Sequence, residues 1–244
     1  MDEEEQHRKA FGRYSGISEE CRILIDDIKN NDNEDDELTL HPEDARHFTN
    51  LAWTLLGEYI ANNAYLSVLS LRGCSLCDEK MAALFSNLIS CTSLNHFDID
   101  HNEFGIDGLQ TMVPFLENLP NLLYLNFMGN DGFNSECFEL LFRTLYRASS
   151  KVRVIYFRNC SITDISALET YTLPNLKELG LNGNNIGNLG CITLANLLQK
   201  EGSKLEQLAV HNTGIDDEGA EILANSLKHN TSLKVIQLYG NNVT

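Results

Sequence analysis

The sequence predicts a curved α/β solenoid with a parallel sheet on its concave face and helices on its convex face. Three observations support this fold class. A short apolar pattern returns seven times, a polar or thiol residue follows it at a fixed place, and a stretch with helical periodicity comes next. Such units cannot bury their apolar side chains alone, so we expect them to stack, strand beside strand and helix beside helix.

The strand pattern is clearest in residues 176–184, LKELGLNGN. Counting Leu176 as position 1, apolar residues occupy positions 1, 4, 6 and 11, and Asn184 occupies position 9. The alternation of positions 4 and 6 is typical of a strand with one buried face. Position 1 falls at residues 66, 94, 122, 152, 176, 205 and 233, so the spacings are 28, 28, 30, 24, 29 and 28 residues.

The second half of each unit has the spacing of a helix. In the unit that begins at Leu176, positions 15, 19, 20 and 23 are Gly190, Leu194, Ala195 and Leu198. Apolar residues at i, i+1 and i+4 form one stripe along a helix. The third unit predicts a helix over 135–148, whereas the fourth leaves room over 163–172 for little more than one helical turn.

Position 9 carries a polar or thiol side chain in every unit. Its residues are Cys74, Asn102, Asn130, Cys160, Asn184, Thr213 and Asn241. An asparagine amide both donates and accepts, so here it can satisfy backbone groups of adjacent coils that the strand ladder does not reach.

The strand pattern LxxLxLxx(N/C/T)xL, with its helical half GxxxLAxxL, resembles the leucine-rich repeat, and specifically the ribonuclease-inhibitor-like subfamily. The resemblance covers the chain from about Tyr65 to its end. It implies a horseshoe whose strands line the concave wall.

We expect three parts along the chain. Residues 1–16 form a flexible acidic tail, residues 17–64 an N-terminal helical cap with a degenerate first coil, and residues 65–244 seven repeats of which the last is incomplete. Within the cap we expect a helix over 18–29, an acidic loop over 30–37, a strand over 38–40, a helix over 45–62 and a buried Trp53.

The last repeat has a strand but no helix after it, because the sequence ends at Thr244. Its apolar side and strand edge are therefore expected to be exposed. Two explanations remain open: the chain belongs to a longer array, or the edge is covered by a partner or by a second copy of the chain through self-association.

The net charge of −17 is uneven: residues 1–44 hold fifteen acidic residues against five Lys and Arg. This charge disfavours nucleic acid and anionic membranes and favours a basic protein partner. No apolar run is long enough to span a bilayer, and an odd number of cysteines suits reduced thiols. The sequence therefore indicates a cytoplasmic protein, and a nuclear location is compatible with it.

The sequence offers no pattern for catalysis, metal or cofactor. We find no GxxxxGK[ST], GxGxxG or HExxH, and the single CxxC at Cys74 includes a residue that the repeat already explains. His96, Asp98 and Asp100 share a strand face, but neighbours two apart are separated by about 6.7 Å, so one ion could not bind all three. We interpret them as a polar, solvent-facing strand, and we expect no enzyme activity.

Positions 3, 5 and 7 point out of the sheet and form columns on the concave wall. The candidate protein-binding residues in these columns are Arg72, His96, Asp98, Asp100, Tyr124, Asn126, Met128, Tyr156, Arg158, Asn182, His211 and Tyr239. Among them Tyr124, Met128, Tyr156 and Arg158 are expected to form one patch beside the two acids. Tyr, Met and Arg are enriched at the centres of interfaces.

The sequence thus predicts a non-catalytic scaffold that binds a protein partner on its concave face. The resemblance leaves two alternatives. Similar acidic arrays include GTPase-activating proteins of the Ran GTPase, and similar repeats form the sensing regions of larger nucleotide-binding receptors. Fold alone does not decide among these functions.

Overall fold

The computed structural model describes residue 25, residues 36–88 and residues 91–244. The expected tail over 1–16 lies outside the described residues, as do the expected helix over 18–29, apart from Ile25, and residues 30–35 of the loop expected over 30–37. Glu37, the last residue of that expected loop, belongs to a strand. Ile25 is fully buried and belongs to the hydrophobic core.

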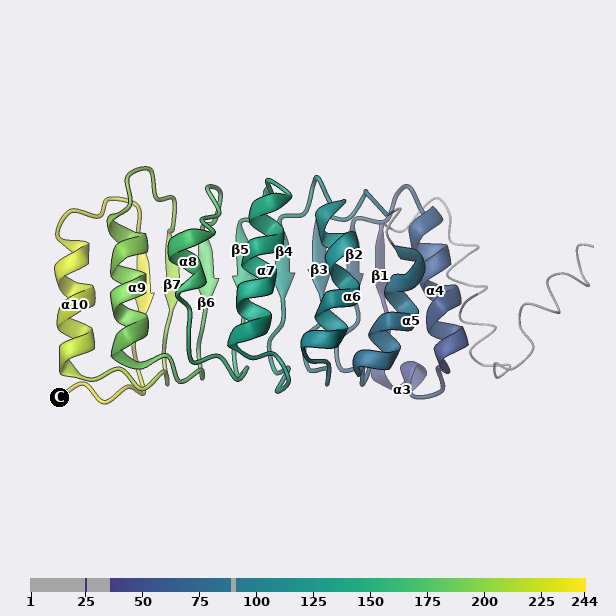
Figure 1. The fold of residues 1–244 in the computed structure, drawn as a ribbon, viewed down its shortest axis with the longest axis horizontal. Coiled ribbons are helices and arrows are strands. Elements are labelled where there is room, and N and C mark those ends of the chain that lie inside the picture. The colour runs from purple at the N-terminus through teal and green to yellow at the C-terminus, as the bar shows by residue number, and fades with distance from the viewer. Residues whose placement is uncertain (1–24, 26–35, 89–90) are drawn as a thin grey trace, which may run out of the picture.

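The described chain forms two layers, with a row of helices covering one face of a sheet (Figure 1). The strands are β1 Glu37–Thr39, β2 Val68–Ser70, β3 His96–Asp98, β4 Tyr124–Asn126, β5 Val154–Tyr156, β6 Glu178–Gly180, β7 Gln207–Ala209 and β8 Val235–Gln237. The helices are α3 Pro42–Ala45, α4 Asn50–Asn62, α5 Asp78–Leu88, α6 Ile106–Glu117, α7 Ser135–Arg147, α8 Ala167–Thr170, α9 Gly187–Gln199 and α10 Asp217–Leu227.

All eight described strands belong to one parallel sheet, in the order of the sequence. Equivalent positions of the repeat face each other, as in the pairing of Leu69 with Phe97 and of Phe97 with Leu125. The α/β leucine-rich solenoid and its register are therefore confirmed. The strand β1 extends this register by pairing Leu38 with Leu69, although it begins one residue before the expected range 38–40.

The helices differ from the prediction mainly at the N-terminal end. The helix expected over 45–62 was wrong at its start, because the chain forms the short α3 and then begins α4 only at Asn50. The Thr49 side chain accepts a hydrogen bond from the Ala52 N–H and caps α4. Trp53 is fully buried, as expected. The fourth unit has only the four-residue α8, which is visibly shorter than its neighbours in Figure 1.

Each repeat strand is followed by a residue with left-handed backbone at position 8. The φ angle is positive at Gly73, His101, Gly129, Asn159, Gly183, Asn212 and Gly240. This backbone region is open mainly to Gly, and among other residues to Asn, Asp and His. The reversal at position 8 ends the strand and turns the next side chain, position 9, into the core.

The position-9 side chains connect successive coils through their backbones, as expected. Asn130 donates to the carbonyl oxygens of Ile99 and Phe127 at 3.1 and 2.7 Å and accepts from the Asn102 N–H at 3.1 Å. Asn102 repeats this arrangement one coil earlier, donating to Leu71. These side-chain hydrogen bonds join each coil to the preceding one where no strand hydrogen bond is available.

Cysteine fills the same role with one bond. Cys74 Sγ donates to the Leu40 carbonyl oxygen at 3.5 Å, and Cys160 Sγ donates to that of Phe127 at 3.3 Å. Burial raises the pKa of both thiols to about 12, so they stay protonated and able to donate.

Beneath the position-9 side chains, phenylalanines fill the space between the sheet and the helices in the middle of the array. The rings of Phe127 and Phe157, on adjacent coils, are stacked at 5.8 Å, and Phe133 contacts both. All three side chains are fully buried. The core is therefore continuous from one coil to the next.

An exposed ion-pair network joins the last three coils. The Lys177 and Lys234 amines both contact the Glu206 carboxylate, at 2.6 and 2.5 Å. Their hydrogen bonds lower the pKa of Glu206 to about 2, that of Lys177 contributing most.

Replacing Asn130 with alanine should reduce the free energy of unfolding by about 2–4 kcal/mol, because three buried backbone groups lose their partner. Asn130→Cys should lose less stability, because a cysteine at position 9 can still donate one hydrogen bond to the preceding coil, as Cys160 does to the Phe127 carbonyl oxygen. Asn121→Ala, at an exposed site, should change stability by less than about 0.5 kcal/mol. Urea denaturation of the three variants measures the differences; equal losses for Ala and Cys would contradict the assigned role.

Glu206→Gln should lower the thermal midpoint slightly at neutral pH and have less effect in acid. A carboxyl group whose folded pKa is depressed contributes stability above its unfolded pKa of about 4.3, and loses it as pH falls towards about 2. Melting curves of both proteins between these pH values check the convergence. A gap between the two curves that widens in acid would disprove it.

Candidate protein-binding site

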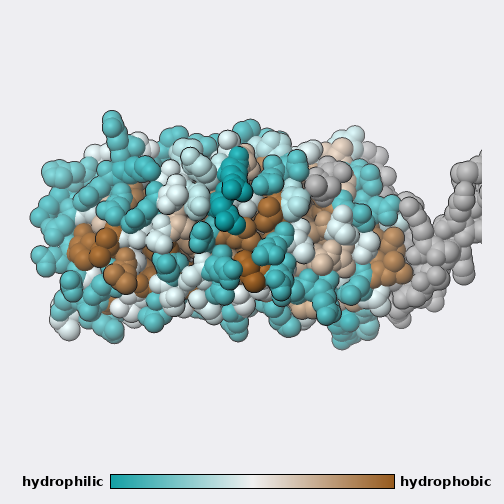
Figure 2. Space-filling view, in the orientation of Figure 1, coloured by the Kyte–Doolittle hydropathy of each residue, from teal (hydrophilic) through white to brown (hydrophobic). Residues whose placement is uncertain are grey.

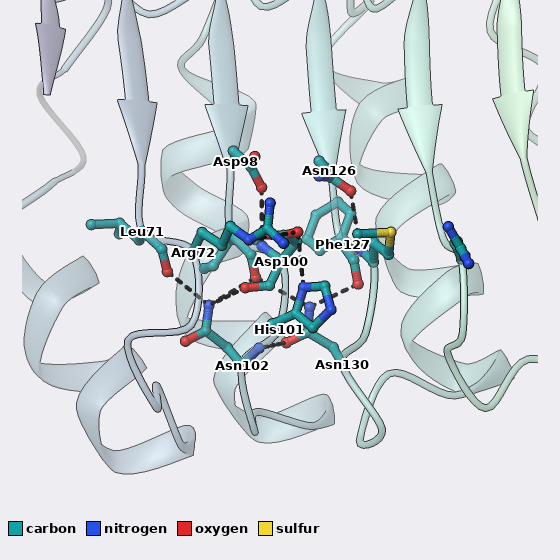
Figure 3. Close-up of polar contacts among 12 residues, drawn as sticks. Leu71, Arg72, Asp98, Asp100, His101, Asn102, Asn126, Phe127 and Asn130 are labelled. Carbon is teal, nitrogen blue, oxygen red and sulfur yellow. Dashed lines mark hydrogen bonds and ion pairs between the residues drawn. The ribbon is translucent and has the colours of Figure 1, made fainter. Parts of the chain in front are cut away.

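Figure 3 shows Asp98 and Asn126 at position 5, and Arg72 and Asp100 at position 7, on the face of the sheet turned away from the helices. Position 3 lies on the same face, because side chains alternate along a strand. We call this surface the open sheet face. The in-register pairing places the same position of each coil side by side, so the expected columns exist.

A row of rings crosses the middle of the open sheet face. His96 and Tyr124 stack with their ring centroids 3.8 Å apart, and Tyr124 meets Tyr156 edge to face at 5.7 Å. The Tyr156 hydroxyl donates to the Glu178 carboxylate on the next strand. The rings are half-buried, because they lie against one another and along the sheet.

The row depends on the lack of a side chain at Gly180. A Cβ atom there would lie 2.6 Å from Cδ1 of Tyr156, which is closer than real Cβ contacts allow. Tyr156 and Gly180 are paired across β5 and β6, so the ring lies over the glycine on its way to Glu178. Gly180 thereby leaves the room that this direction of the Tyr156 ring requires.

Beside the rings, two carboxylates occupy the end of β3. Asp98 Oδ1 accepts from the Asp100 N–H at 3.1 Å, and Asp100 Oδ2 lies 2.9 Å from His101 Nδ1. The Arg72 guanidinium approaches the same Oδ2, with Nε at 3.6 Å. Figure 3 shows these groups converging at the strand ends, with Asn126 on the adjacent strand.

The surroundings of these side chains shift the pKa values of three of them. Burial raises the pKa of Asp98, and the charge of Asp100 together with a side-chain hydrogen bond to it raises this pKa further, against hydrogen bonds from the Asp100 N–H and the Asn126 amide. Burial also lowers the pKa of His96, which favours the neutral ring at neutral pH. Burial, with the two aspartates and Glu178, raises the pKa of Tyr124 to about 12.

A second group lies towards the C-terminal end of the face. His211 and Tyr239 stack at 4.1 Å, and the Asn182 side chain accepts from the His211 N–H. Burial and the Arg158 charge both lower the pKa of His211. His211 and Tyr239 thus form a group separate from the row of His96, Tyr124 and Tyr156.

The expectation of a fully solvent-facing wall was wrong at four positions. Asp100 is 0 % exposed, Asn126 7 %, Asn182 9 % and His211 6 %. For two of them the covering groups are clear: Arg72 in the same column and His101 at position 8 lie against Asp100, and Tyr239 lies on His211. Arg72, Arg158 and Tyr239 are exposed, and the remaining candidates are partly exposed.

Three residues of the site were not singled out from the sequence. Glu178 and Gly180 sit in the same columns, but their roles depend on the direction of the Tyr156 ring. His101 had a signal that could have found it, because position 8 otherwise holds only Gly or Asn. A histidine with positive φ at that position places its ring against Asp100.

Within residues 25, 36–88 and 91–244, no group of three His, Cys, Asp or Glu is arranged to hold a metal ion. No described helix has the length and apolar character needed to cross a membrane.

The opposite, helix-covered face is mainly hydrophilic, with separate apolar patches (Figure 2). Its exposed large apolar residues are Leu51, Tyr146, Leu189 and Ile192, of which the last two belong to α9. These apolar side chains therefore lie on the face opposite to the aromatic row and the carboxylate pair.

Two stretches match sequence profiles of repeats. Residues 150–198 match the profile described as Leucine Rich repeats (2 copies), and residues 90–113 match Leucine Rich repeat. Among curated proteins, ribonuclease inhibitor of Sus scrofa is 24 % identical over 222 residues, covering 77 % of this chain and 48 % of that protein.

NACHT, LRR and PYD domains-containing protein 14 of Mus musculus is 26 % identical over 154 residues, covering 59 % of this chain and 15 % of the mouse protein. The chain thus spans about half or less of the length of these relatives. A solved structure of Leiomodin-1 Actin-Binding Site 2 aligns with a TM-score of 0.46 and 16 % identity, over 64 % of this chain and 75 % of that one.

Gly180→Ala should displace the Tyr156 ring and separate its hydroxyl from Glu178. The pKa of Tyr156 is raised first by burial and then by the Glu178 hydrogen bond and charge, so it should fall towards the ordinary tyrosine value of about 10. A spectrophotometric tyrosine titration measures this shift, with circular dichroism to monitor folding. Ser70→Ala, at the same position of a distant strand, is the control and should leave the titration unchanged.

Proposed function

We propose that this chain, a leucine-rich repeat protein similar to ribonuclease inhibitor, is a non-catalytic scaffold that binds a protein partner on its open sheet face. The observation that carries the proposal is the ordered row His96–Tyr124–Tyr156–Glu178 beside a carboxylate pair. Folding requires buried side chains at positions 4 and 6, but it does not require aromatic rings on the outer columns.

The row has the physical properties of an interface centre. Tyrosine rings bury a large apolar area and keep a polar end, and here their orientations are already fixed by contacts with each other and with Glu178. Side chains that are ordered before binding lose less conformational entropy when a partner covers them. Residues of this kind contribute most of the affinity in many interfaces.

The area is sufficient for a stable complex. Eight strands spaced by about 4.8 Å give a wall about 34 Å wide, which can accommodate an interface of about 800 Å² on each side. The acidic chain, with Asp98 and Asp100 on this wall, favours a basic partner surface and would speed its association at low salt.

A second candidate is the sensing region of a larger receptor. It is supported by the similarity to the mouse NACHT, LRR and PYD domains-containing protein, of which this chain covers a small part. In that role the open sheet face would still bind a protein, and the binding would be relayed to other domains. The residues of the site give no such support to the Ran-directed GTPase-activating alternative, and a GTP hydrolysis assay with small GTPases tests it directly.

Alanine at both Tyr156 and Arg158 should abolish or greatly weaken capture of the partner. Loss of two central side chains typically costs about 2–4 kcal/mol, equivalent to a 30- to 1000-fold rise in Kd. Affinity capture from cell extract followed by mass spectrometry identifies proteins that bind the native chain, and calorimetry with the purified partner measures the loss.

The matched control changes the other face. Leu189→Ala with Ile192→Ala removes two exposed apolar side chains from α9 and should leave partner affinity within about twofold. If instead the α9 variant loses the partner and the Tyr156/Arg158 variant keeps it, the binding surface is the helix face and the proposal fails.

A further inference from the structure

The carboxylate pair on the open sheet face contains an acceptor with no donor. Oδ1 of Asp100 is buried and accepts no hydrogen bond from an N–H or hydroxyl group of the described residues. The side chain that interacts with the Asp100 carboxylate from the same strand is Asp98, itself a carboxyl group. The other oxygen, Oδ2, contacts His101 at 2.9 Å. A buried carboxylate oxygen without a donor is costly, so a charged or hydrogen-bonding group supplied from outside would be bound favourably there.

The cation already beside Asp100 is held loosely. Arg72 Nε is 3.6 Å from Oδ2, too far for a hydrogen bond, and 62 % of the Arg72 side chain is exposed. Because its guanidinium makes this one long contact and is mostly exposed, Arg72 can move into solvent with little loss of free energy. It covers Asp100 without satisfying Oδ1.

The surroundings match a planar cation. Asp98, which is partly exposed, lies two residues from the buried Asp100 on the same face, so a cation that takes the place of Arg72 would meet two carboxylates. The stacked rings of His96 and Tyr124 begin strands β3 and β4, two residues before Asp98 and Asn126, and lie beside the carboxylates on the same face. Guanidinium groups pair with carboxylates through two parallel hydrogen bonds and pack well on aromatic surfaces.

We propose that Asp98 and Asp100 receive an arginine side chain of the protein partner, which displaces Arg72 and packs beside the His96–Tyr124 stack. This inference rests on the proposed function and names the chemistry that the partner must present. A guanidinium has enough N–H groups to reach both carboxylates, including Oδ1 of Asp100.

The direct test uses small peptides in place of the partner. The ¹⁵N-labelled chain is titrated with acetyl-Gly-Arg-Gly-amide, and with two twins in which citrulline or lysine replaces arginine. Citrulline has the shape of arginine without its charge. The arginine peptide should shift the amide signals of Asp100, Asn102 and Asn126 with a Kd on the order of millimolar, and both twins should bind at least about tenfold more weakly.

Variants distinguish binding at the Asp98/Asp100 pair from general electrostatic attraction to the negatively charged chain. Asp98→Asn with Asp100→Asn should raise the Kd of the arginine peptide by about tenfold or more. Glu218→Gln with Glu221→Gln on α10 removes the same charge from a distant exposed helix and should have an effect below about twofold. Arg72→Gln, which leaves both carboxylates intact, should tighten binding by about two- to fivefold because the competing cation is gone.

Each opposite result overturns the inference. Equal affinity for arginine and citrulline excludes a charge-dependent site, equal affinity for lysine excludes recognition of the guanidinium, and an equal loss in the α10 variant reduces the effect to net charge. Should the Asp98/Asp100 variant fail to fold, the Arg72→Gln result still decides. If these tests fail while Tyr156→Ala with Arg158→Ala still loses the partner, the proposed function stands without the arginine site.

Discussion

The structure depends on one requirement: the backbone groups beyond the end of each short strand must find partners in the next coil. Three-residue strands leave most of the loop backbone outside the sheet ladder. The position-9 side chain supplies the missing bonds, since Asn130 alone connects the backbones of Ile99, Phe127 and Asn102. The left-handed residue before it makes this geometry available by turning position 9 inward.

This constraint also produces the candidate site. Once position 9 fixes the register, positions 3, 5 and 7 of successive coils lie next to each other on the open sheet face, whatever residues they hold. Their identities are then free to serve binding, which explains how rings, carboxylates and an arginine can gather there without disturbing the core. The same turn places His101, at position 8, against Asp100.

The site is therefore built from contacts between coils, and its side chains order one another. Tyr156 points towards Glu178 because Gly180 leaves room for its ring, and Tyr124 is confined between His96 and Tyr156. Asp100 is buried by its neighbours although it sits on the outer face of the sheet. A surface that is ordered in this way loses little entropy on binding, but it also retains an unsatisfied carboxylate oxygen.

The sequence by itself determined the repeat, the parallel register, the inward asparagines and the columns of the outer face, because each follows from a local spacing that recurs seven times. It could not determine the burial of Asp100 and His211, or the direction of the Tyr156 ring. Those depend on side chains 22 to 30 residues apart, such as Tyr156 and Glu178 or Arg72 and Asp100, whose distances no local pattern encodes. Only packing between coils decided them.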